Sequence, residues 1–129
     1  MAPSLLIAPE IARSFVAERF PADRLICREG DPGDKFYIIV RGEVSITTSG
    51  STGQEQELGI LQDGDYFGEI ALLRDLPRTA TVRTRLPSLL LALQRQQLLK
   101  LMVKAPQLRE ILEHAIDTRL EERARAKEV

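Results

Sequence analysis

The sequence of 129 residues predicts a mainly β fold with flanking helices: an eight-stranded antiparallel jelly-roll sandwich with a short internal helix and two C-terminal helices. Between Phe15 and Leu93, short β-favouring segments alternate with clusters of Gly, Pro, Asp and Ser. After Leu93 the apolar residues recur with a period near that of an α-helix. These two patterns favour antiparallel strands joined by tight turns and followed by helices.

Glycine marks several of the turns between the expected strands. Gly42 separates two β segments at a hairpin, and "SGSTGQ", residues 49–54, is typical of a flexible hairpin tip. Before the first strand, residues 8–14 are expected to form a turn of helix that begins at Pro9. The expected strands are residues 15–20, 24–29, 35–41, 43–49, 55–61, 65–68, 78–84 and 88–94.

Two helices are expected after the strands, at about residues 94–103 and 106–126, because Pro106 ends the first and begins the second. The second helix has an apolar stripe that must cover another apolar surface. Its last turns, from Glu121, lose this stripe, and we expect them to fray in solvent. The stripe consists of Leu108, Ile111, Leu112, Ala115, Ile116 and Leu120.

Composition predicts a single domain spanning residues 1–129, with the β-roll at about 14–93. The 18 basic and 19 acidic residues nearly cancel, which argues against a nucleic-acid partner or an anionic membrane surface. Only one cysteine, Cys27, is present, so no internal disulfide is expected. No apolar segment is long enough for direct membrane insertion and no secretory signal is present, so we expect a cytoplasmic protein.

The sequence contains no set of residues that favours catalysis. With a single histidine, His114, and a single cysteine, the usual zinc and iron ligand clusters cannot be assembled. No nucleophile elbow, dinucleotide-binding loop or P-loop is present. We therefore expect no enzymatic activity, no catalytic residue, no metal and no cofactor.

The segment "FGEIALLRDLPRTA", residues 67–80, contains the residues best suited to ligand binding. Gly68 permits a tight entry into a short helix, whose first N–H groups favour an anion. Arg78, returned by the turn at residues 75–77, can add a bidentate guanidinium to the same oxygens. Glu69 can accept a hydrogen bond from a neighbouring hydroxyl. A sugar phosphate would satisfy both ends of the segment.

The same segment also offers space and an apolar surface. Ala71 and Ala80 are small enough for a ligand to approach the backbone, while Leu72 and Val82 can contact a flat base. A purely structural interpretation is available: a glutamate in the first turn of a helix stabilises it by about 0.3–1 kcal/mol, and an arginine can be a solvated surface charge.

The longer stretch "FGEIALLRDLPRTATV" resembles the phosphate-binding cassette of the cyclic nucleotide-binding domain family, found in regulatory subunits of cAMP-dependent protein kinase, in cyclic-nucleotide-regulated channels and in the catabolite activator protein. Upstream, "REGDPGDKFYIIVRGEVSI" resembles the glycine-punctuated strands of that family. Downstream, two helices separated by "KAP" are also similar, so the resemblance covers about residues 14–120.

The resemblance implies a ligand, cAMP or cGMP, and a role for each matching residue. Glu69 would bind the ribose 2′-hydroxyl and Arg78 the cyclic phosphate. Gly68, Ala71 and Thr79 would add contacts around the phosphate and sugar. The ligand-binding residues expected on this basis are Phe67, Gly68, Glu69, Ile70, Ala71, Leu72, Arg78, Thr79 and Ala80.

The sequence departs from the family in ways that bear on the ligand. Only residues 4–13 are available for the helical segment that precedes the first strand in the family, so the chain is expected to be a piece of a larger protein. No aromatic residue follows Phe67, which leaves an aliphatic lid or the edge of His114 to cover the base. In the family, a hydroxyl at the place of Thr79 often assists guanine recognition, yet some members with Thr prefer cAMP. On family frequency, cAMP is favoured.

The expected function is a regulatory sensor. Cyclic nucleotide binding would change how the helix from Pro106 packs, and thereby relay occupancy to an effector domain or partner protein such as a channel, transporter or kinase. The apolar stripe of that helix could close over the base, bind a partner helix, make a homo-oligomer or pack on its own domain. One alternative is an interaction module that binds no nucleotide. Another is a transcription factor, which would need a helix-turn-helix after the terminal helix.

Overall fold

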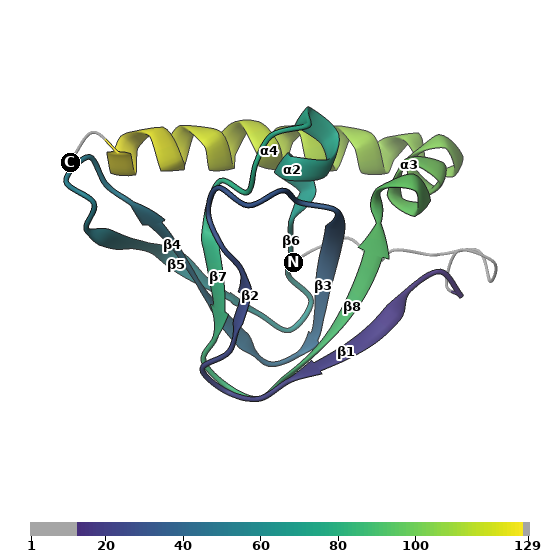
Figure 1. Ribbon diagram of the computed structural model, residues 1–129. Helices are drawn as coiled ribbons and strands as arrows, with labels where there is room; N and C mark the ends of the chain where they lie inside the picture. The colour runs from purple at the N-terminus through teal and green to yellow at the C-terminus, as the bar shows by residue number, and fades with distance from the viewer. Residues whose placement is uncertain (1–12, 128–129) are drawn as a thin grey trace.

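The structure is a computed structural model that describes residues 13–127 (Figure 1). Two four-stranded antiparallel sheets form a sandwich, with strand orders β1-β8-β3-β6 and β2-β7-β4-β5. This confirms the predicted mainly β fold. The strands are β1 (Val16–Phe20), β2 (Leu25–Cys27), β3 (Lys35–Arg41), β4 (Glu43–Ser49), β5 (Glu55–Gln62), β6 (Tyr66–Phe67), β7 (Thr81–Thr84) and β8 (Ser88–Gln94).

Each strand overlaps the segment predicted for it, and the boundaries of β2 and β7 differ most. The prediction that β7 begins at Arg78 is wrong, because β7 begins at Thr81. Residues 78–80 instead form a connection whose backbone bonds to the loop before β3: Arg78 N–H donates to Asp31 O at 2.8 Å. The helical turn expected at residues 8–14 falls almost entirely outside the described residues.

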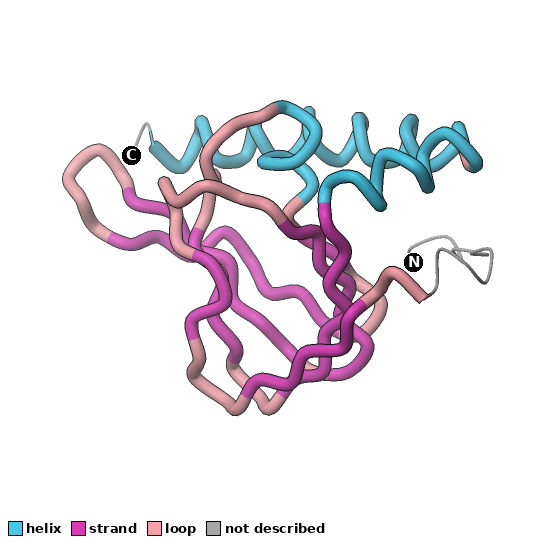
Figure 2. Tube along the Cα trace, turned by 45° about the vertical axis from the view of Figure 1, so that its right-hand side comes forward, coloured by secondary structure: helices cyan, strands magenta, loops and turns pink. Residues whose placement is uncertain are grey.

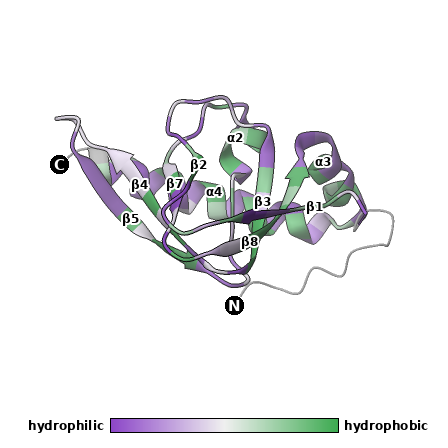
Figure 3. Cartoon of the chain, turned by 60° about the horizontal axis from the view of Figure 1, so that its bottom comes forward, coloured by the Kyte–Doolittle hydropathy of each residue, from purple (hydrophilic) through white to green (hydrophobic). Residues whose placement is uncertain are grey.

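The core between the two sheets comes from alternating residues of the inner strands. Figure 3 shows the contrast between β8, which is largely hydrophobic, and the more hydrophilic edge strand β5. The turn between β3 and β4 requires glycine, since Gly42 has φ +133° and a Cβ there would collide with Ser88. The core cluster consists of Tyr37, Ile39, Val44, Ile46, Phe67, Ala80, Val82, Leu90 and Ala92.

Three helices complete the described part of the chain: α2 (Glu69–Arg74), α3 (Arg95–Lys104) and α4 (Pro106–Lys127). Figures 1 and 2 show α4 running along one end of the sandwich, from α3 past α2 to the β4–β5 hairpin. A second core cluster fixes the helices on the sandwich: Phe36, Leu72, Leu93, Leu98, Leu101, Met102, Leu108 and Leu112.

The apolar stripe of α4 packs on the chain's own sandwich and helices. Leu108, Leu112 and Ile116 are buried, as the stripe predicts. However, the expectation that the last turns fray is wrong. The helix continues to Lys127, and Ala126 is buried. Between the buried residues Ile116 and Ala126, this face of the helix has Arg119 and Arg123, whose partners lie inside the domain, as described below.

Between residues 13 and 127, no helix is both long and apolar enough to cross a membrane. Within the same range, no three His, Cys, Asp or Glu side chains gather as they would around a metal ion.

Candidate functional site

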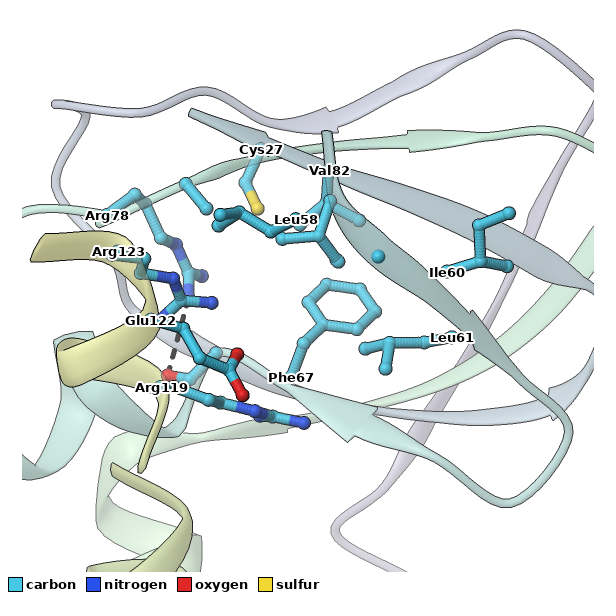
Figure 4. Close-up of a pocket in the computed structure, with 14 residues that line it drawn as sticks. Cys27, Leu58, Ile60, Leu61, Phe67, Arg78, Val82, Arg119, Glu122 and Arg123 are labelled. Atoms are coloured by element: carbon cyan, nitrogen blue, oxygen red, sulfur yellow. Dashed lines mark hydrogen bonds between the residues drawn. The ribbon is translucent and has the colours of Figure 1, made fainter. Parts of the chain in front are cut away.

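A cavity of about 250 Å³ lies between β4, β5 and β7 on one side and segment 67–80 and α4 on the other (Figure 4). Its wall is apolar on the strand side, where Ile46, Leu58 and Val82 contribute. Its other side is charged. The charged side chains that line the cavity are Arg78, Arg119, Glu122 and Arg123. The cavity therefore has an apolar wall on one side and a basic edge, with three arginines and one glutamate, on the other.

The structure brings the predicted site residues to this cavity in two different ways. Phe67, Gly68, Arg78 and Ala80 line it directly. The other predicted residues do not line it. Glu69 and Thr79 contact arginines of its edge, while Ile70, Ala71 and Leu72 lie buried in α2. Leu72, which was expected to contact a base, packs in the second core cluster.

Gly68 forms the sharp corner that begins α2. It is the N-cap residue, with φ +96°, a conformation that favours glycine. A Cβ at this position would lie 2.7 Å from Lys35 O and 2.8 Å from Arg78 Nη1. Glycine is therefore needed both for the backbone angle and for the close approach of the Arg78 guanidinium.

Arg78 is buried, with 7% of its surface exposed, and is fixed by backbone oxygens. Its Nη2 donates to Lys35 O at 2.8 Å and its Nη1 to Gly68 O at 3.4 Å. Among the described residues no carboxylate pairs with it. Since carbonyls orient a guanidinium without neutralising it, a positive charge remains at the cavity edge and favours an anion.

Glu69 is 1% exposed, so its carboxylate requires a partner. Arg119 of α4 supplies it: Nη1 donates to Glu69 Oε1, and Nη2 donates to Tyr66 O at 3.0 Å. The Arg119 guanidinium also lies over the Tyr66 ring, 5.0 Å from its centroid. This ion pair joins segment 67–80 to the terminal helix.

Arg123, one turn further along α4, reaches the other end of the segment. Its Nη1 donates to Thr79 Oγ1 at 2.7 Å, while its Nε is buried and has no hydrogen-bond partner among residues 13–127. Burial lowers the pKa of Arg123, and the nearby Arg119 acts in the same direction, although Glu69 opposes it. Its charge is thus only partly compensated in this structure.

Neither Arg119 nor Arg123 was expected from the sequence. Both follow the buried positions Leu112 and Ile116 at helical spacing. This spacing is the feature of the sequence that could have placed the two arginines on the face of the helix that packs against the domain. The side chain expected to cover the cavity was aliphatic or His114. Instead, His114 is exposed and does not line the cavity, and α4 presents Arg119, Glu122 and Arg123.

Cys27 of β2 also lines the cavity. Burial raises the pKa of its thiol, although Arg78 opposes this rise. The thiol is therefore a neutral, apolar part of the wall at physiological pH.

The structure is thus a two-sheet β-roll with a basic cavity beside its terminal helix. The particular family follows from comparison with known proteins. The chain belongs to the family described as the cyclic nucleotide-binding domain, whose model matches residues 17–105.

Curated relatives and solved structures agree with this assignment. A cAMP-dependent protein kinase regulatory subunit of Emericella nidulans is 43% identical over 76 residues, which are 59% of this chain and 18% of that protein. A cyclic nucleotide-gated potassium channel of Mesorhizobium japonicum is 37% identical over 111 residues, 86% of this chain and 29% of the channel. The chain thus spans less than a third of either relative. The crystal structure of the Thermus thermophilus catabolite activator protein matches with a TM-score of 0.78 and 30% identity, covering 91% of this chain and 57% of that one.

Proposed function

We propose that this domain is a sensor that binds a 3′,5′-cyclic nucleotide in the cavity beside segment 67–80. The observation that carries the proposal is the pair of buried, opposite charges at the two ends of that segment: Arg78 lines the cavity, and Glu69 pairs with Arg119, which also lines it. Membership of the family supports it. The name of the kinase regulatory subunit given above points to cAMP as the first nucleotide to test.

In this proposal the cyclic phosphate binds to Arg78. Its guanidinium is held in place before the ligand arrives by Lys35 O and Gly68 O, so little ordering is needed on binding. A cyclic phosphate has one negative charge, which matches the single positive charge of Arg78, whose hydrogen-bond partners among the described residues are neutral carbonyl oxygens.

The ribose 2′-hydroxyl binds to Glu69. Arg119 donates to Oε1 of this carboxylate, which leaves acceptor positions on Oε2 for a hydroxyl. The base then extends along the apolar wall formed by residues such as Ile46 and Val82, towards α4. Phe67, Gly68, Thr79 and Ala80 surround the sugar and phosphate, and Ile70, Ala71 and Leu72 hold α2 behind them.

Occupancy is relayed through α4, because the same segment that binds the ligand also contacts this helix. Arg74 of α2 pairs with Glu113 at 2.6 Å and with Asp117 at 3.3 Å, and Arg119 and Arg123 reach Glu69 and Thr79. A ligand that alters these contacts shifts the packing of α4, to which an effector domain or partner protein responds. The domain acts by binding and not by catalysis.

Isothermal titration of the chain with cAMP and with cGMP tests this proposal. We expect binding by the unchanged chain and at least about tenfold weaker binding by Arg78→Leu, because a charge-assisted hydrogen bond contributes about 1.5–3 kcal/mol. Arg83→Leu is the matched control, since Arg83 lies on β7 with its side chain 47% exposed and does not line the cavity. No binding of either nucleotide by the unchanged chain would favour the alternative, an interaction module with this fold.

A further inference from the structure

Glu29, in the loop between β2 and β3, makes two hydrogen bonds that the proposed ligand site does not involve. Its Oε1 accepts the Thr48 Oγ1–H at 3.0 Å and the Ser49 backbone N–H at 2.8 Å. Thr48 is 1% exposed, and both donors lie at the end of β4, where the chain enters the β4–β5 hairpin. The half-buried carboxylate of Glu29 therefore joins this hairpin to the loop, although the two are 20 residues apart in the sequence.

The backbone of the same loop holds Arg78. Gly30 N–H donates to Arg78 O at 2.8 Å, and Arg78 N–H donates to Asp31 O at 2.8 Å. The backbone N–H of Glu29 donates to Thr81 Oγ1 at 3.0 Å, so the contacts continue to the start of β7. Because Glu29 directly precedes the two bonds to Arg78, a contact that fixes the Glu29 side chain also limits the movement of the Arg78 backbone.

The β4–β5 hairpin also contacts the terminal helix. α4 packs against β4 and β5, and Figures 1 and 2 show its C-terminal end beside the hairpin. Arg119 and Arg123 of the same helix reach Glu69 and Thr79. Segment 67–80, α4, the hairpin and the loop with Glu29 therefore form a closed ring of contacts around the proposed ligand site.

We propose that Glu29 is a positioning residue for nucleotide binding, which acts through Arg78 and makes the β4–β5 hairpin respond to the ligand. This inference rests on the proposed function and adds to it a residue that does not line the cavity. While its carboxylate is bonded, the loop holds the Arg78 backbone in place before the ligand arrives. Without those bonds, part of this order must be gained on binding, which weakens affinity. The same bonds transmit a displacement of Arg78 to the hairpin.

Titration calorimetry with cAMP and with cGMP, well below the melting temperature, tests the effect on affinity. We expect Glu29→Ala to bind roughly three- to tenfold more weakly than the unchanged chain, about the effect of one hydrogen bond. Glu29→Gln should stay within about twofold, because its amide oxygen can accept both bonds now made by Oε1. Glu55→Ala is the matched control, since the Glu55 carboxylate also accepts a threonine hydroxyl of β4, that of Thr47 at 2.7 Å, but within the hairpin itself.

Thr48→Val tests the same contact from the hairpin side, because it keeps the shape of the side chain but removes the hydroxyl donor to Glu29. If affinity depends on this bond, Thr48→Val should bind more weakly than the unchanged chain, and its combination with Glu29→Ala should bind no more weakly than Glu29→Ala alone. Amide NMR adds a readout that a merely structural role would not change. The nucleotide should shift the signals of residues 47–55 in the unchanged chain, but not in Glu29→Ala.

The inference is overturned if Glu29→Ala binds as tightly as the unchanged chain, or if Glu55→Ala weakens binding equally. Shifts at residues 47–55 that persist in Glu29→Ala, or a loss in Glu29→Gln as large as that in Glu29→Ala, would also overturn it. If Glu29→Ala does not fold, Thr48→Val decides, and unchanged affinity in that variant contradicts the inference. Failure of the unchanged chain to bind either nucleotide overturns the proposed function itself, whereas binding without these effects overturns only this inference.

Discussion

At the scale of single residues, the site depends on how Arg78 is held. Lys35 O and Gly68 O orient its guanidinium, and two glycines leave room for it. Gly68 supplies the positive φ at the start of α2, while Gly33 lies against the other side of the guanidinium. The result is a buried cation that is already placed for an anion.

Gly33→Ala should therefore disturb the site without removing any ligand-binding group. The added Cβ would lie 2.5 Å from the Ala71 Cβ and 2.7 Å from Arg78 Nε, so one of these groups must move. We expect cyclic nucleotide affinity to fall by about tenfold, because a charge-assisted contact worth about 1.5–3 kcal/mol is misplaced. Titration calorimetry measures this.

Gly53→Ala provides the control for Gly33→Ala. Gly53 lies between β4 and β5 with φ +80°, and a Cβ there would have no neighbour within 4 Å. This change should lower the melting temperature through backbone strain but leave affinity unchanged. If Gly33→Ala bound the nucleotide as tightly as the unchanged chain, the claim that a side chain at residue 33 displaces the Arg78 guanidinium would be wrong.

At the scale of elements, the sequence predicts the strands and helices better than it predicts what α4 does. The strands were predictable because alternating apolar residues and turn residues specify them locally, as in β3 and β4 around Gly42. The contribution of α4 to the site was not, because an amphipathic pattern assigns every arginine to solvent. Arg119 and Arg123 lie on the buried face, and their partners, Glu69 and Thr79, are 50 and 44 residues away. Nothing local in the sequence specifies such pairs.

The Arg119–Glu69 pair should contribute to the stability of the domain. Arg119→Gln leaves a carboxylate that is 1% exposed without its ion-pair partner, and we expect a loss of about 3 kcal/mol. Because the Arg119 side chain is 19% exposed, this is at the lower end of the range for buried pairs. Urea unfolding of Arg119→Gln, Glu69→Gln and the double variant measures the coupling between the two side chains. Strictly additive losses would show that the pair does not join α4 to segment 67–80.

At the scale of the whole molecule, one connected structure links the cavity to the C-terminal end. The two sheets present an apolar wall, segment 67–80 lies across it, and α4 closes the cavity with charged side chains that contact both ends of the segment. A ligand bound at Glu69 and Arg78 would lie next to α4, the helix through which we propose that occupancy is relayed. Ligand binding and a change in the packing of α4 are therefore expected to occur together.

The most direct test is an amide NMR titration of the chain with cAMP and with cGMP, which reports both whether a nucleotide binds and where. We expect the largest shift changes at residues 67–72, 78–80 and 119–123, and small changes along β1, which is remote from the cavity. Changes at 119–123 together with those at Glu69 and Arg78 would support both the site and its link to α4. No shift with either nucleotide, or shifts clustered away from segment 67–80, would contradict the account.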